Sequence, residues 1–118
     1  MKFPIKTMTA ASLLALSTMA YAAPAVKIGV LTDMSGTYAA MGGPGSVAAA
    51  QMAIDDCLAN ECKGMEIELI SADNQNKADL GAATAREWFD RRGVTAIADL
   101  TNSSVAIAVQ NIAREKIK

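Results

Sequence analysis

The chain has 118 residues, with 11 lysine and arginine residues, 12 aspartate and glutamate residues and no histidine. This length accommodates one small domain at most. The absence of histidine excludes Ser-His-Asp triads, Cys-His pairs and zinc sites with imidazole ligands, and a net charge of -1 argues against a surface that binds nucleic acid.

The first 22 residues have the three-part pattern of a secretory signal peptide. Two lysines precede an uncharged, apolar run over residues 8–20, and the small residues Ala20 and Ala22 stand where a signal peptidase reads the chain. The apolar run is too short to span a bilayer, and no cysteine follows it to carry a lipid. We therefore expect an exported protein that is cleaved after Ala22 and is not inserted in a membrane.

Strand and helix patterns alternate along the rest of the chain. Apolar, partly β-branched stretches predict strands at residues 26–31, 65–70 and 94–100. Apolar residues at three- and four-residue steps predict a helix after each strand, the second of them ended by Gly93. The three apolar stripes are Val47, Ala50, Ile54 and Leu58; Leu80, Thr84 and Trp88, with Ala85 and Phe89 beside them; and Val105, Val109 and Ile112.

This alternation predicts an α/β fold in which βαβαβα units form a parallel sheet. Three strands leave both edges of such a sheet open, so we expect residues 23–118 to be an incomplete domain. By itself this segment is expected to fold poorly or to aggregate through its open edges.

Cys57 and Cys62 are an even pair in a chain with an export signal, which favours a structural disulfide over two free thiols. They lie five residues apart, where a predicted helix runs into a loop. Because the two Cα atoms of a disulfide lie within about 7 Å of each other, we expect the last helical turn to unwind.

Three loops follow the predicted strands, and ligands of open parallel sheets bind at this edge. The first loop, residues 32–46, is rich in glycine but has neither G-x-G-x-x-G nor G-K-[ST], so it does not match a nucleotide-binding loop. Two interpretations remain open. The loop is a turn that places the first helix, or it is a wall for a small organic ligand formed by Ser35, Tyr38 and Met41.

The third loop brings Asn102, Ser103 and Ser104 to the expected N-terminus of the third helix. At least one of them is expected to cap the helix, since these residue types accept hydrogen bonds from free N–H groups. Three in succession exceed the need for a cap, and the remaining hydroxyl and amide groups suit a carboxylate at the positive end of the helix dipole.

Asp33, Asp73 and Asp99 each fall near the carboxyl end of a predicted strand. This pattern resembles the acidic pocket of a phosphoacceptor domain, which the signal peptide argues against. Residues 73–76 also lack the glycine and the distal glutamate of a calcium loop, so we expect no metal and no cofactor. Asp73 and Asn76 are expected to shape the turn and to cap the second helix.

The order and spacing of these motifs resemble a known family. The segments VKIGVLTDMSG, SADNQNK and ADLTNSSVAIAV, which follow an export signal, are similar to the amino-terminal part of periplasmic substrate-binding proteins of ABC importers. The most similar group is the branched-chain amino acid, or leucine-binding, type.

The resemblance implies a type I periplasmic-binding-protein fold, in which two α/β lobes close on a ligand, and residues 23–118 are then the amino-terminal part of lobe 1. It implies a periplasmic protein that is not an enzyme, and that delivers a small solute to an inner-membrane permease. By position, the family's ligand contacts fall at Met41, Asn102 and Ser103. Members that bind amino acids tend to have an aromatic residue and a serine at the first two positions, so aromatic acids and amides stay open as ligands.

Two other functions stay open. An extracytoplasmic ligand-binding domain of a sensor would use the same fold and would be followed by a transmembrane segment. An exported enzyme is a remote alternative, because without histidine it would need a carboxylate or a serine-lysine site, and no lysine pairs obviously with Ser35 or Ser103.

Overall fold

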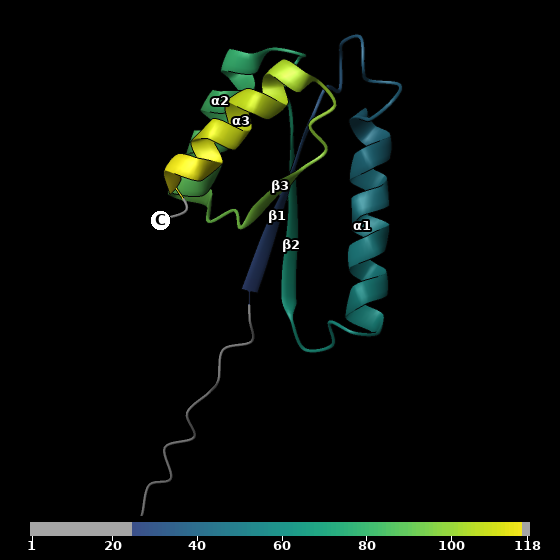
Figure 1. Cartoon of the computed structure of the whole chain (residues 1–118). Helices are drawn as coiled ribbons and strands as arrows, with labels where there is room; N and C mark the ends of the chain where they lie inside the picture. The colour runs from purple at the N-terminus through teal and green to yellow at the C-terminus, as the bar shows by residue number, and fades with distance from the viewer. Residues whose placement is uncertain (1–24, 117–118) are drawn as a thin grey trace, which may run out of the picture.

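The computed structural model describes residues 25–116, in which three parallel strands form one sheet with helices on both faces (Figure 1). The predicted signal peptide and its cleavage site lie outside the described residues. Strand β1 (Ala25–Thr32) is central, with β2 (Glu66–Asp73) on one side and β3 (Ala96–Ala98) on the other. Both strand pairs are parallel, which confirms the expected α/β fold with alternating strands and helices.

The helices divide between the two faces of the sheet. Helix α1 (Gly43–Ala59) lies on one face, whereas α2 (Ala78–Glu87) and α3 (Ser103–Lys116) pack side by side on the other (Figure 1). A π-helical turn, η1 (Trp88–Arg92), continues α2. It ends at Gly93, which has a φ of 67°, so the predicted end of the second helix is confirmed.

Two strands differ by two or more residues from the sequence prediction. Strand β2 runs three residues beyond the predicted end, because residues 71–73 pair with residues 30–32 of β1. Strand β3 is shorter than the predicted 94–100, since only Ala96–Ala98 pair with β1. After it, Asp99 adopts a φ of 62°, which ends the extended backbone.

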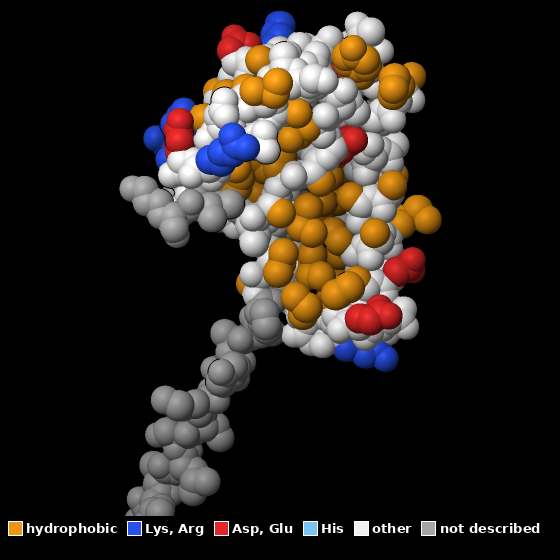
Figure 2. Space-filling view, in the orientation of Figure 1, with side chains coloured by type: hydrophobic (Ala, Val, Ile, Leu, Met, Phe, Trp, Pro, Cys, Tyr) orange, Lys and Arg blue, Asp and Glu red, His pale blue; other side chains and the backbone are white. Residues whose placement is uncertain are grey.

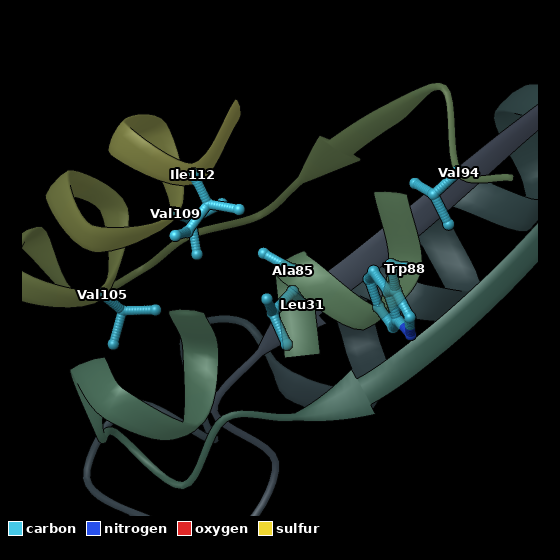
Figure 3. Packing of buried hydrophobic residues seen from close by; sticks show 7 residues of the cluster. All are labelled: Leu31, Ala85, Trp88, Val94, Val105, Val109 and Ile112. Carbon is cyan, nitrogen blue, oxygen red and sulfur yellow. The ribbon is translucent and has the colours of Figure 1, made fainter. Parts of the chain in front are cut away.

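The hydrophobic core lies between the sheet and the layer formed by α2, η1 and α3. Its buried members are Leu31, Ala85, Trp88, Val94, Val105, Val109 and Ile112 (Figure 3). The predicted stripe of α3 is therefore confirmed in full. On α2 the stripe is rotated toward Gly81 and Ala85, which are buried, while Leu80 and Thr84 are half-buried. A Cβ on Gly81 would lie 2.6 Å from Val105 Cγ1, so the missing side chain lets α3 approach closely.

Trp88 packs directly on the central strand. A Cβ built on Gly29 would lie 2.2 Å from Cζ3 of the indole ring, so only glycine leaves room for this ring against β1. Trp88 exposes 5% of its surface and is a member of the core cluster (Figure 3). The contact fixes the distance between η1 and the sheet.

The opposite face of the sheet is covered less completely. A groove between α1 and the sheet is lined by Ile28, Ala50, Ala53, Ile54, Cys57, Cys62, Ile67 and Ala98. Figure 2 shows hydrophobic side chains gathered over this part of the sheet. Of the predicted α1 stripe only Ile54 is buried, while Val47, Ala50 and Leu58 are half-buried. The single helix α1 therefore leaves apolar surface of the sheet open in the described part of the chain.

Cys57 and Cys62 are joined by a disulfide bond, with their Cα atoms 5.0 Å apart. The expected unwinding of the last helical turn does not occur, because Cys57 keeps its place in α1 and the helix ends at Ala59. The chain then turns back, and the Cys62 N–H donates to the Cys57 carbonyl at 2.7 Å. The turn brings the second cysteine to the helix instead of the helix opening toward it.

Candidate functional site

The loops that follow β1, β2 and β3 lie together at the carboxyl end of the sheet (Figure 1). Residues 33–42 form the first loop, residues 74–77 the second and residues 99–102 the third. This is the edge at which open parallel sheets bind ligands. The hydrogen bonds of the three loops show which of their polar groups remain free for a ligand.

Asp33 organises the first loop from within. Its side chain is fully buried, and its carboxylate accepts hydrogen bonds from the backbone N–H groups of Gly36 at 2.7 Å, Tyr38 at 2.9 Å and Ser35 at 3.3 Å. Three donors satisfy a buried charge that would otherwise be strongly disfavoured. A Cβ on Gly36 would lie 2.7 Å from the carboxylate, so glycine at this position allows the loop to close around Asp33.

Asp73 joins the first loop to the second. Its carboxylate accepts hydrogen bonds from the Ser35 hydroxyl at 2.6 Å, the Met34 N–H at 2.9 Å and the Gln75 N–H at 2.8 Å. These bonds, that of Ser35 foremost, lower the pKa of Asp73 below its ordinary value of 3.8, because they favour the ionised form. Asp73 is therefore a charged brace between two loops.

Asn74 anchors the second loop to β1. It is fully buried, its Nδ2 donates to the Leu31 carbonyl at 3.2 Å, and its Oδ1 accepts from the Asn76 N–H at 2.8 Å. Gln75 and Asn76 then take left-handed backbone conformations, with φ values of 50° and 58°. Such conformations are uncommon outside glycine and cluster at functional sites.

The prediction that Asp73 and Asn76 cap the second helix is wrong. The residue before α2 is Lys77, which makes no side-chain hydrogen bond to the helix. Asp73 and Asn76 are directed to the first and third loops instead. Asp73 does shape the turn through its bond with the Gln75 N–H, as predicted.

Asn102 is the cap of α3. Its Oδ1 accepts from the Ser104 N–H at 2.7 Å, the Ser104 hydroxyl at 2.6 Å and the Val105 N–H at 3.2 Å. Its Nδ2 donates to Asn76 Oδ1. Both ends of the Asn102 amide therefore bond to other residues, the Nδ2 end through one of its two hydrogens. Among residues 25–116 no hydrogen-bond partner takes the Ser103 hydroxyl, and this residue is exposed.

The predicted ligand-contact residues differ in how free they are. Ser35 is exposed, but its proton is donated to Asp73, so its oxygen remains only as an acceptor. Tyr38 is half-buried, and Met41 exposes 78% of its surface. The structure brings Ser35 to Asp73 and Asn102 to Asn76. No hydrogen bond between described residues links the side chains of Tyr38, Met41 or Ser103 to them.

A second polar group lies where the third loop meets the start of α1. A Cβ on Gly42 would lie 2.8 Å from Thr32 Oγ1 and 2.9 Å from Asp99 Oδ2, so glycine permits this contact. Thr32 Oγ1 accepts from the Gly43 N–H at 3.1 Å, while Asp99 Oδ2 and Thr101 Oγ1 are buried and have no hydrogen-bond partner among the described residues. Within residues 25–116, no cluster of three or more acidic or cysteine side chains is arranged to hold a metal ion.

Sequence reasoning placed the loops correctly but missed the roles of Asp33, Asn74 and Asn76. The signal available for Asp33 is an aspartate directly after an apolar strand and two residues before Ser-Gly, a combination typical of side chains that bond to the following backbone. No pattern in the sequence joins Asn76 to Asn102, because the two lie 26 residues apart.

Comparison with known proteins identifies the family. Residues 25–117 match the family described as periplasmic binding protein. The chain belongs to this family. Membership implies a periplasmic location, and the solved relatives are solute-binding proteins rather than enzymes. The curated proteins contain no match.

Three solved structures illustrate the relationship. A periplasmic binding protein from Burkholderia mallei is 46% identical with a TM-score of 0.73, over 80% of this chain and 25% of its own. A branched-chain amino acid ABC transporter ligand-binding protein from Burkholderia xenovorans is 50% identical with a TM-score of 0.72, over 79% and 25%. A branched-chain amino acid binding protein from Streptococcus pneumoniae, solved with isoleucine, is 26% identical with a TM-score of 0.69, over 78% and 26%.

These matches confirm the type I periplasmic-binding-protein fold and the resemblance to the branched-chain amino acid type. The chain spans about a quarter of the length of these relatives. Within residues 25–116, the helices are too short or too polar to cross a membrane.

Proposed function

We propose that this chain forms the amino-terminal part of lobe 1 in a periplasmic solute-binding protein of an ABC importer. The whole protein would bind a small carboxylate or amide, such as an amino acid or an aromatic acid, and deliver it to an inner-membrane permease. Its signal peptide would direct export to the periplasm and would be cleaved after Ala22. No step of this function makes or breaks a covalent bond in the solute.

The observation that carries the proposal is the hydrogen bonding at the N-terminus of α3, which lies at the carboxyl edge of the sheet. Asn102 takes the N–H groups of Ser104 and Val105, whereas the Ser103 hydroxyl has no partner among the described residues. The Ser103 hydroxyl stands at the start of a 14-residue helix, where the helix dipole favours a negatively charged group. The two together suit a carboxylate.

The other predicted residues suit the remainder of a small ligand. Met41 and Tyr38 offer an apolar wall, and the Ser35 oxygen offers an acceptor for an ammonium or amide donor. Asn102 supports the site by capping α3, and its Nδ2 donates only one of its two hydrogens to Asn76, so the other can donate to a ligand. Solute-binding proteins from Rhodopseudomonas palustris with the same fold were solved with 3,4-dihydroxybenzoic acid and with benzoate. Aromatic acids are therefore included among the proposed ligands.

The test is a ligand-dependent thermal shift of the complete gene product that contains residues 25–118. The probes are isoleucine, leucine, benzoate, 3,4-dihydroxybenzoate and benzamide. A ligand present at 100 times its Kd stabilises the folded state by about 2.7 kcal/mol, which is a readily measured rise in Tm. Mass spectrometry of the probe after incubation should recover it unaltered.

Ser103→Ala is expected to reduce the shift given by carboxylate probes, whereas Ser71→Ala, an exposed serine within β2, is the matched control and should not. The absence of a shift with every probe would contradict the proposed ligand class. A chemically altered probe would indicate an enzyme instead.

A further inference from the structure

Asn76 is the residue through which the second and third loops touch. Its Oδ1 accepts from Asn102 Nδ2, and its own backbone is held in place by Asn74, which is buried and bonded to the Leu31 carbonyl of β1. A chain of hydrogen bonds therefore runs from the central strand through Asn74 and Asn76 to the cap of α3. Each of these bonds is made by a side chain of the short segment after β2.

The conformation of Asn76 limits which residues can perform this role. At a φ of 58° a residue other than glycine is strained, and asparagine and aspartate are the side chains that tolerate it best. Glycine would adopt the same backbone without strain but would offer no acceptor. Asparagine thus combines the required backbone with an oxygen that reaches Asn102.

Most of helix α3 is held against the core by its buried apolar side chains. Val105, Val109 and Ile112 lie in the core against α2 and the sheet, and they do not depend on Asn76. Asn102 and the exposed Ser103 precede Val105 at the start of the first turn, and the bond between Asn102 and Asn76 links this start to the second loop. Loss of this bond should therefore move or loosen the first turn while the helix and the core persist.

We propose that Asn76 is a positioning residue of the solute site: through Asn102 it fixes the first turn of α3, and thereby the Ser103 hydroxyl, at the carboxyl edge of the sheet. This inference rests on the function proposed above. Asn76 itself does not contact the solute.

Four single variants of the complete gene product isolate this role. Asn76→Gly removes the acceptor and keeps the left-handed backbone, whereas Asn76→Asp keeps both. Asn102→Ser retains a good cap but removes the amide donor. Gln75→Gly is the matched control, since Gln75 has a φ of 50° and, within residues 25–116, its exposed side chain bonds only to Lys77, two residues further on.

The first readout is backbone amide exchange, followed by mass spectrometry of peptides that cover residues 101–106. In Asn76→Gly and Asn102→Ser the exchange of this segment should become about fivefold to tenfold faster, the effect expected for one lost hydrogen bond. The double variant should be no faster than either single variant, because both remove the same bond. Asn76→Asp and Gln75→Gly should exchange as the unaltered protein does, and amides of β1 should be unchanged throughout.

The second readout is the Kd of whichever probe from the thermal-shift series binds. Asn76→Gly should raise this Kd about fivefold to tenfold with little change in Tm, whereas Gln75→Gly should not raise it. Unchanged exchange at residues 101–106 in Asn76→Gly, or equal acceleration in Gln75→Gly, would overturn the positioning role. A Kd that stays the same despite faster exchange would also overturn it.

The two proposals fail separately. If no probe binds the unaltered protein, the proposed function fails. The exchange measurements then still decide whether Asn76 holds the first turn of α3.

Discussion

Replacement of Gly29 by alanine should destabilise the protein through a single added methyl group. An ideal Cβ at this position lies 2.2 Å from Cζ3 and 2.4 Å from Cε3 of Trp88, whereas carbon atoms in contact prefer about 3.5–4.0 Å. Neither side can yield easily. β1 is hydrogen-bonded to a strand on each side, and Trp88 is 5% exposed within the core. Overpacking of this kind costs typically about 1–3 kcal/mol, and the size of the overlap places Gly29→Ala at the upper end, about 3 kcal/mol.

The assay is urea unfolding of the complete gene product, followed by circular dichroism. Gly45→Ala is the matched control, because nothing lies within 4 Å of the added methyl group and the residue is inside α1. Alanine there should stabilise the protein by about 0.5–1 kcal/mol. Trp88→Leu removes the ring that the added methyl group meets. The double variant Gly29→Ala with Trp88→Leu should therefore lose less free energy of unfolding than the sum of the two single losses. A Gly29→Ala variant within about 0.5 kcal/mol of the unaltered protein would refute the argument, since that is the range of neutral surface changes.

Three further predictions concern the loops and the disulfide. Asp33→Ala should destabilise the protein by about 1–3 kcal/mol, because three N–H groups lose a buried acceptor. Asp33→Asn should destabilise it by less, because the amide oxygen replaces part of that acceptor. Urea unfolding measures both losses, and equal values would contradict this reasoning. The pKa of Asp73 is lower in the folded protein than its unfolded value of 3.8, so its contribution to stability is complete above pH 3.8 and is lost as the pH falls through the folded pKa. Unfolding of the unaltered protein should therefore depend more steeply on pH below 3.8 than unfolding of Asp73→Asn, and parallel pH profiles would exclude the effect. Reduction of the Cys57–Cys62 disulfide, or Cys57→Ser with Cys62→Ser, should lower the free energy of unfolding by no more than about 2 kcal/mol, since the bond closes a short loop. A larger loss in a urea titration would contradict this expectation.

The order of elements and much of the core could be predicted because they follow from periodicity. The α3 stripe of Val105, Val109 and Ile112 and the apolar run of β1 are local patterns, and both are confirmed. The ends of the strands were predicted less accurately, because pairing with a neighbouring strand decides where each one ends. The last residues of β2 are polar or small, and they are extended because β1 offers them partners. The rotation of α2 depends on the contact of Gly81 with Val105 of α3. The sequence of α2 alone does not show this contact.

The candidate site was predictable in place but not in detail. The predicted parallel strands placed the three loops at one edge of the sheet, and helix capping was expected within residues 102–104. The roles of Ser35 and Asn102 depend on partners in other loops, Asp73 and Asn76. A hydroxyl or amide that looks available in the sequence can already be committed to such a partner in the fold.

The bracing of the three loops also limits how this protein can be redesigned. Asp33 holds the first loop, Asp73 joins it to the second, and Asn76 joins the second to the third. A loop grafted alone from a relative would leave Asp73 or Asn76 facing a side chain of the wrong length or hydrogen-bonding type. An exchange of the proposed solute site between relatives should therefore include residues 33–38, 73–76 and 102–104 together.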